Sequence, residues 1–191
     1  MYKILTAGLL ALATSLAMAQ GVPQPIFSSN DALESSFLDG KNYVSAGVGI
    51  SSGKYHNSTM AGSQGGTTSF TRFGIGRNFT EKLFGEFAYG QSGATNYTYE
   101  NNGYSQRYHD YQLSVGYYVY EGLYARVGAD RSFVNSGAVN STGNGYLFGT
   151  GYKYNVTKDW ALVADYTRFN SVGGDYSSGF NQYTANAQYK F

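Results

Sequence analysis

The sequence ends with Tyr183-Thr-Ala-Asn-Ala-Gln-Tyr-Lys-Phe191, in which apolar or small residues occupy every odd position and polar residues every even position. Because successive side chains of a β-strand point to opposite faces, Tyr183, Tyr189 and Phe191 share one face, while Thr184 and Lys190 lie on the other. The stretch therefore predicts a strand with one apolar and one polar face that runs to the last residue.

The N-terminus carries the pattern of a secretory signal. Lys3 precedes an apolar run over residues 4–16, and the small-residue site Ala17-Met-Ala19 follows. A positive charge, a short apolar stretch and a small-residue cleavage site are the three parts of such a signal. We therefore expect residues 1–19 to be a cleaved signal peptide and the rest of the chain to be exported.

The composition narrows the class of protein. Beyond the signal there is no run of about 18 apolar residues, so the sequence predicts no membrane-spanning helix. The chain has 13 Lys and Arg and 12 Asp and Glu, which provides no net field for nucleic acid. It has no cysteine, which excludes disulfides, and we expect neither a cofactor nor a metal. The 20 Tyr, 12 Phe and 26 Gly suit strands with aromatic belts.

Eight alternating segments follow residue 41, each near the roughly 9–11 residues that a tilted spanning strand needs. They cover approximately residues 42–51, 68–79, 83–92, 106–119, 122–133, 143–155, 160–169 and 179–191. Their connections alternate between short turns (80–82, 120–121, 156–159) and long stretches rich in Gly, Ser, Asn and Thr (52–67, 93–105, 134–142, 170–178). This asymmetry is typical of membrane barrels. The sequence predicts an all-β fold, an eight-stranded antiparallel up-and-down transmembrane β-barrel over residues 41–191, preceded by a periplasmic segment over 20–40.

Assigning the alternating faces places apolar side chains outside and charged ones inside. The inward-facing charged residues are Arg72, Glu86, Asp110, Arg126, Asp130, Lys153, Asp165 and Lys190. An eight-stranded barrel is just wide enough for side chains to fill its interior, and charges in such a place must pair or be hydrated. We therefore expect a lumenal network of ion pairs and hydrogen bonds that plugs the barrel.

The paired features of the two ends, an export signal and a terminal aromatic strand, resemble the eight-stranded outer-membrane barrel families of the OmpA transmembrane-domain, OmpX/Ail and opacity-protein kind. The resemblance implies a monomer in the bacterial outer membrane, surrounded by outer-membrane lipid and lipopolysaccharide. It also implies that Tyr183, Tyr189 and Phe191 form part of the signal that the barrel-assembly machinery reads.

The same resemblance is weak for function, because such barrels host unrelated activities. We expect a structural or surface-recognition, adhesin-like role for the loops, with a host or phage surface ligand, and no enzymatic activity. Tyr97, Tyr99 and Tyr104 in the second loop are the candidate contact residues. One alternative is a small porin. Another is a lipid A-modifying enzyme, since His56 and Ser58 form a His-x-Ser triplet, but the triplet lies in the first predicted loop and the sequence places no carboxylate beside it.

Deleting Phe191 should reduce insertion in cells more than refolding in vitro. Truncating a ring at a strand end in the aromatic belt costs only about 1–2 kcal/mol of burial, whereas the resemblance makes this ring part of the assembly signal. Outer-membrane fractionation and refolding into detergent micelles measure the two effects. Insertion in cells at the parental level would contradict the assembly role.

Overall fold

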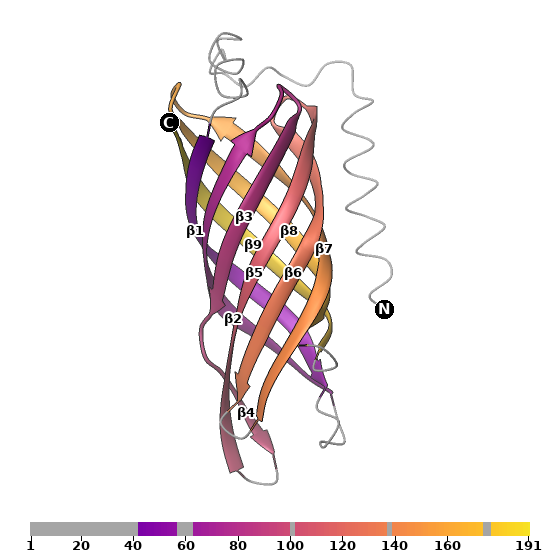
Figure 1. Ribbon diagram of the computed structural model, residues 1–191. Helices are drawn as coiled ribbons and strands as arrows, with labels where there is room; N and C mark the ends of the chain where they lie inside the picture. Colours follow the sequence, from indigo (N-terminus) through magenta and orange to yellow (C-terminus); the bar gives the residue numbers. More distant parts are fainter. Residues whose placement is uncertain (1–41, 57–62, 100–101, 137–138, 174–176) are drawn as a thin grey trace, which may run out of the picture. The chain divides into compact units, whose positions relative to one another are not determined.

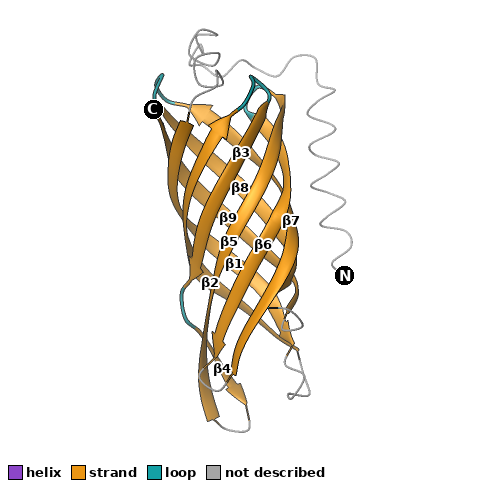
Figure 2. Cartoon of the chain, in the orientation of Figure 1, coloured by secondary structure: helices purple, strands orange, loops and turns teal. Residues whose placement is uncertain are grey.

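The computed structural model describes residues 42–56, 63–99, 102–136, 139–173 and 177–191, so the predicted signal peptide and the predicted segment 20–40 lie outside the described residues. The elements are all β-strands, drawn in Figure 1 and Figure 2. They are β1 (Asn42–His56), β2 (Ser63–Asn78), β3 (Leu83–Ser92), β4 (Thr95–Tyr99), β5 (Asn102–Tyr120), β6 (Leu123–Ser136), β7 (Val139–Asn155), β8 (Trp160–Val172) and β9 (Ser177–Lys190). The described part of the chain contains no helix long and apolar enough to cross a membrane.

The strands form one closed, antiparallel sheet. Sequential neighbours pair along the chain except β3 and β4; in addition, β1 pairs with β9 and β3 pairs with β5. β3 and β4 lie in line against the same strand, because β3 pairs with the second half of β5 and β4 with its beginning. Together they make one interrupted strand, so the nine segments close as the predicted eight-stranded up-and-down barrel. Every spanning strand has a neighbour on both sides, which leaves no open edge.

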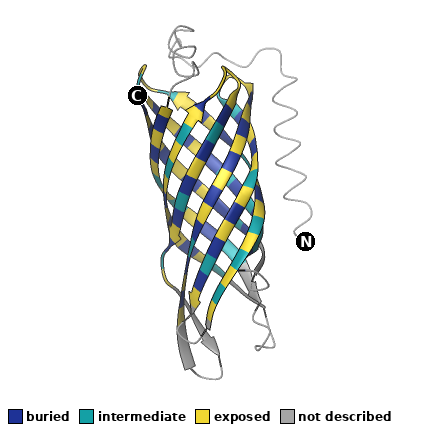
Figure 3. Ribbon diagram, viewed as in Figure 1, coloured by how far each residue is buried: buried dark blue, intermediate teal, exposed yellow. Residues whose placement is uncertain are grey.

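The two faces of the sheet are separated as the alternation predicts. Val48, Ile75, Leu113, Val127 and Leu162 point outward and are more than half exposed. Figure 3 shows the resulting alternation of exposed and buried residues along the strands. Large aliphatic and aromatic side chains cover the outer face, and polar groups are buried inside. This is the reverse of the arrangement in a soluble protein. The exterior is therefore suited to lipid.

The connections at one end of the barrel, here called the short-turn end, are as tight as predicted. Residues 79–82 and 156–159 form two turns of the same design. In the first, the Thr80 hydroxyl oxygen accepts a hydrogen bond from the Leu83 amide at 2.9 Å. In the second, the Thr157 hydroxyl oxygen accepts one from the Trp160 amide at 3.0 Å. Threonine hydroxyls satisfy backbone donors of such turns locally.

The third short turn consists of Glu121 and Gly122, which have φ angles of 25° and 86°. Two consecutive residues with positive φ match the twist of the flanking strands, which favours a two-residue hairpin. At Gly122 a Cβ atom would collide with the Lys153 carbonyl, so glycine is required there.

The opposite end, here called the long-hairpin end, differs from the sequence prediction. The expected first loop, residues 52–67, consists largely of strand, because Ser52 pairs with Thr67 and the ladder continues to His56 and Ser63. The expected second loop, residues 93–105, contains β4, and the ends of β6–β9 likewise extend beyond their predicted limits. The prediction located the end of the apolar pattern correctly. The backbone ladder, however, does not need apolar side chains and continues past it.

Two clusters of buried apolar residues fill the interior of the barrel. The first, at the long-hairpin end, consists of Phe70, Tyr108, Val134, Leu147, Phe169, Val172 and Phe180. The second, at the short-turn end, consists of Phe84, Tyr118, Tyr124 and Val163. Inward-facing glycines make room for these rings: a Cβ atom on Gly116 would overlap the Phe84 ring. Below we call the first cluster the apolar plug.

The full-length protein should migrate on gels at one position when folded and at another after boiling. A closed ladder must break along its whole length to unfold, so detergent alone unfolds it slowly. A truncated chain lacking residues 177–191 loses the pairing of β9 with both β1 and β8 and should show only the unfolded mobility. Identical mobility of the full-length chain before and after boiling would contradict the closed barrel.

Candidate functional site

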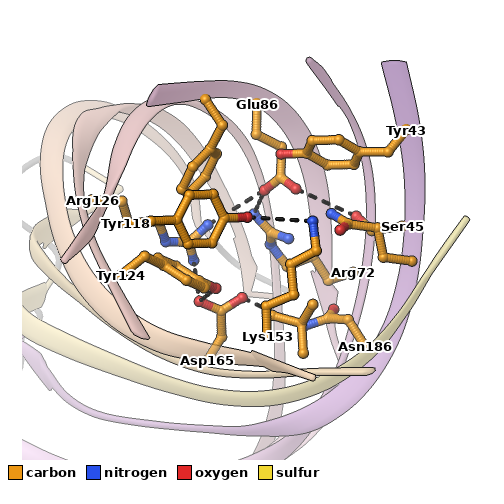
Figure 4. A pocket seen from close by; sticks show the side chains of 13 residues that line it. Tyr43, Ser45, Arg72, Glu86, Tyr118, Tyr124, Arg126, Lys153, Asp165 and Asn186 are labelled. Carbon is orange, nitrogen blue, oxygen red and sulfur yellow. Dashed lines mark hydrogen bonds and ion pairs between the residues drawn. The ribbon is translucent and has the colours of Figure 1, made fainter. Parts of the chain in front are cut away.

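A cluster of ion pairs occupies the interior near the short-turn end (Figure 4). Glu86 on β3 lies between two arginines, Arg72 on β2 and Arg126 on β6. Its carboxylate forms an ion pair with Arg72 and a second one, at 3.4 Å, with Arg126. Ser45 on β1 also donates a hydrogen bond to it, at 3.5 Å. One carboxylate therefore connects side chains from four strands across the lumen.

The cluster continues through Asp165 on β8. Arg126 lies 3.6 Å from the Asp165 carboxylate and also donates a hydrogen bond to Thr167. The Tyr124 hydroxyl donates to Asp165 at 2.6 Å, and the Asn186 amide donates to it at 3.5 Å. Each charge in this cluster is almost fully buried, and buried charges persist only when neighbouring groups compensate them.

Lys153 and Lys190 lie toward the short-turn end and are both 4% exposed. The Lys153 ammonium donates to the Tyr118 hydroxyl at 3.4 Å and lies 5.7 Å from the centre of the Tyr43 ring. Lys153 and Tyr118 border two cavities: one of about 20 Å³ inside the ionic cluster and one of about 310 Å³ at the short-turn mouth. They separate the interior from that mouth.

Asp110 and Asp130 lie apart from this cluster, nearer the long-hairpin end. Asp110 is fully buried and accepts hydrogen bonds from the amides of Gln112 and Gln182 at 3.2 Å. Among the described residues, no ion pair involves either aspartate. The eight predicted lumenal charges thus all face the interior, and Arg72, Glu86, Arg126 and Asp165 join one another in ion pairs.

The apolar plug closes the lumen beyond Asp110. Phe169, Phe180 and Val134 are completely buried, and the Tyr108 and Phe180 rings meet edge to face at 4.6 Å between centroids. The charge-based prediction missed this plug. The sequence did contain the information, because Phe70 is two positions from the inward-facing Arg72 and therefore lies on the same face of its strand. Within the described residues, ions would meet both a dry layer and an ionic layer.

The other predicted residues have separate positions. Tyr97 and Tyr104 are cross-strand partners on β4 and β5, and Tyr99 is also on β4, so these residues belong to a hairpin and the loop expected there is wrong. Their side chains lie outside the described part. The proposed assembly residues face outward: Tyr183 is 46% exposed, Tyr189 39% and Phe191 58%.

The two histidines lie on different strands, His56 on β1 and His109 on β5. The backbone of His56 ends β1, and Ser58 lies outside the described residues, so the triplet is not tested. His109 faces outward, where its ring stacks on Phe133 at 4.9 Å between centroids. Its neighbour Asp110 faces inward, as strand geometry requires. Within the described ranges, no group of three or more His, Cys, Asp or Glu is placed to hold a metal ion.

β-Structure crosses a bilayer as a closed ladder with an apolar exterior, because lipid cannot hydrogen-bond the backbone. The fold and lumen thus define a transmembrane β-barrel. The chain belongs to the outer membrane protein beta-barrel domain family, whose model matches residues 6–191. A search of curated proteins finds no match.

Solved structures agree on the fold. The Ail attachment invasion locus protein of Yersinia pestis, in complex with the heparin analogue sucrose octasulfate, is 12% identical, with a TM-score of 0.52 over 79% of this chain and 99% of that one. Neisserial surface protein A is 19% identical, with a TM-score of 0.53 over 78% and 97%. The N-terminal barrel domain of Pseudomonas aeruginosa OprF is 13% identical, with a TM-score of 0.52 over 79% and 100%.

The family places this protein in the bacterial outer membrane. Short turns of such barrels lie on the periplasmic side and longer connections on the outside. The ionic cluster therefore lies toward the periplasm, and the apolar plug lies toward the cell exterior.

Replacing Glu86 by Gln should destabilise the barrel by about 3–5 kcal/mol, because it leaves the buried charges of Arg72 and Arg126 without their shared carboxylate. Urea unfolding in detergent micelles, followed by tyrosine fluorescence, measures the change. Glu81→Gln, which removes an exposed carboxylate from a short turn, is the matched control and should be near neutral. Equal effects of the two substitutions would show that the ion pairs do not support the barrel.

Proposed function

We propose that this protein is a closed surface barrel that acts through its external hairpins, in recognition or in envelope structure, and that it is neither an enzyme nor an open pore. The observation that carries the proposal is the double closure of the lumen. The ionic cluster around Glu86 and the apolar plug around Phe180 fill successive levels of the interior. With its interior occupied, the barrel offers its outer surfaces for interaction.

The extension of the ladder supports the external role. The β1–β2 hairpin continues in register from Ser52 and Thr67 to His56 and Ser63, and β4 pairs with the start of β5. Strands that continue past the apolar belt present surface outside the membrane on a rigid base. Rigid elements position recognition surfaces more accurately than free loops do. Ail, whose structure was solved with a heparin analogue, has the same fold, and at 12% identity this likeness extends to the fold alone.

The small porin is the second candidate, and the cavity of about 310 Å³ at the periplasmic mouth is the feature that favours it. Of the residues that line this cavity, Tyr118 and Lys153 also border the ionic cluster. A conducting path would have to move these side chains and open the apolar plug as well. The closed barrel is therefore the better account.

Reconstituted protein should give no sustained channels in planar bilayers. Passage of an ion would require desolvation at the apolar plug as well as displacement of buried charge pairs. A trimeric porin inserted under the same conditions provides the positive control. Stable, long-lived conductance from the unmodified protein would place the small-porin function first.

Shortening two external hairpins tests the recognition role. In the first hairpin, Asn-Gly replaces residues 54–65, so that the new turn joins Gly53 directly to Gly66. In the second, a Gly-Ser turn replaces residues 95–104. Gly53 faces the Phe180 ring and Gly93 bonds to Ser69, so both are kept. We expect a folded, inserted barrel that has lost adhesion to host cells or to immobilised sulfated glycans, and lost phage adsorption.

The comparison uses one bacterial strain that expresses either the parent or the shortened barrel at equal surface levels. A shortened barrel that does not fold would make the hairpins structural. A shortened barrel that folds and keeps every interaction of the parent would overturn surface recognition and leave a structural role in the envelope.

A further inference from the structure

Asp130 is a buried carboxylate for which the described residues provide no counter-charge. Its side chain on β6 is 5% exposed, and neither carboxylate oxygen has a hydrogen-bond partner. Arg126 lies four residues along the same strand, roughly 13 Å away, and pairs with Glu86 and Asp165. A second buried carboxylate, Asp110, repels it. Buried groups left in this state call for a specific explanation, such as a bound ion.

The polar groups around Asp130 are already engaged. The Ser132 hydroxyl beside it donates to the Gly143 carbonyl at 3.4 Å and accepts from the Gly173 amide at 2.8 Å. Asp110 takes the amides of Gln112 and Gln182. These two amides are therefore directed to Asp110 and not to Asp130.

Oxygen atoms of three residues converge over Gly145, which lies directly opposite Asp130 in the sheet. A Cβ atom placed on this glycine would lie 2.6 Å from Asp130 Oδ1, 2.9 Å from Asn170 Oδ1 and 2.9 Å from the Ser171 carbonyl oxygen. These are the three nearest heavy atoms to that position. At Gly149, four residues along the strand, the nearest atom is likewise a carbonyl oxygen, that of Tyr166 at 2.5 Å, but a nitrogen of Arg126 lies beside it at 3.2 Å.

The orientation of the Asn170 amide follows from its own contact. Asn170 Oδ1 accepts a hydrogen bond from the Tyr146 amide at 2.7 Å, so the oxygen, and not the NH2 group, faces Gly145. Asp130 Oδ1, Asn170 Oδ1 and the Ser171 carbonyl can only accept hydrogen bonds when the carboxyl is ionised. Three acceptors directed at one small space repel one another unless a cation lies between them.

We propose that Asp130, Asn170 and the Ser171 carbonyl form a binding site for a hard divalent cation, with Ca²⁺ as the best fit, over Gly145. Carboxylate, amide and backbone carbonyl oxygens are the ligands that Ca²⁺ takes in proteins, in flexible geometry. The site needs one carboxylate only, which explains why no cluster of three acidic or histidine residues marks it.

The position gives the cation a structural effect. The ligands come from β6 and β8, and the glycine between them comes from β7. Tyr146, next to Gly145, is 62% exposed on the outer face, and Leu147, two residues from Gly145, belongs to the apolar plug. A cation there links β6 and β8 across β7, beside the apolar plug, and neutralises the charge of Asp130. The affinity expected of a site with so few protein ligands is on the order of 10⁻⁴–10⁻³ M.

The test uses the full exported chain, refolded in micelles of an uncharged detergent without lipopolysaccharide. Urea unfolding is measured in chelator and in millimolar Ca²⁺, and Tb³⁺ luminescence excited through tyrosine reports direct binding. For the parent we expect Ca²⁺ to raise the unfolding midpoint, and we expect saturable Tb³⁺ luminescence that Ca²⁺ displaces. Mg²⁺, which demands stricter octahedral geometry, should displace Tb³⁺ less effectively.

Asp130→Asn should abolish both responses, whereas Glu81→Gln, which removes an exposed carboxylate far from the site, should keep them. Gly145→Ala fills the space between the oxygens while leaving Asp130 in place, and it should also lose the responses. If Asp130→Asn does not refold, Gly145→Ala decides the question.

Two results would overturn the site. The first is a parent barrel whose stability and Tb³⁺ luminescence do not respond to Ca²⁺, or a Gly145→Ala variant that responds as the parent does. The second is an Asp130→Asn barrel that is more stable than the parent in both chelator and Ca²⁺, because this would mean that the native carboxyl is buried in its protonated form.

Discussion

Closure of the backbone ladder is the constraint on which the rest of the structure depends. The pairings of β1 with β9 and of β3 with β5 leave every spanning strand bonded on both sides. In lipid an unpaired backbone group costs several kcal/mol, so the sheet must close before any side chain can contribute. Closure also divides the side chains into an outer set that meets lipid and an inner set that must fill a narrow lumen.

Two kinds of side-chain layer, one ionic and one apolar, fill the lumen. Toward the periplasm, Glu86 and Asp165 compensate Arg72 and Arg126, and the Tyr124 hydroxyl and the Asn186 amide add hydrogen bonds to Asp165. Toward the outside, Phe169 and Phe180 form a dry layer with the Tyr108 ring. Between them lie Asp110, satisfied by neutral amides, and Asp130, whose oxygens face those of Asn170 and Ser171. The interior is thus a series of layers with different chemistry.

This layering bears on how the fold acquires different functions. The closed ladder and the apolar exterior are requirements of the membrane and are shared by barrels of less than 20% identity. The lumenal layers and the external hairpins are free to differ, because neither is needed for the ladder itself. In this protein the lumen is filled, and β4 and the ends of β1 and β2 extend the sheet at the long-hairpin end.

The sequence by itself determined the barrel, since alternation with period 2, three short turns and a terminal aromatic strand leave one closed arrangement with a known inner and outer face. It also determined which charges face inward, because parity along a strand decides the face of every residue. Parity does not determine which residues of different strands meet. Three features of the lumen depend instead on the stagger between strands. Arg72 and Arg126 share Glu86, Asp130 lies apart from every basic group described, and Phe70, Phe169 and Phe180 join in one plug. The extension of the strands past the apolar belt was equally hidden, because backbone hydrogen bonds continue where the side-chain pattern ends.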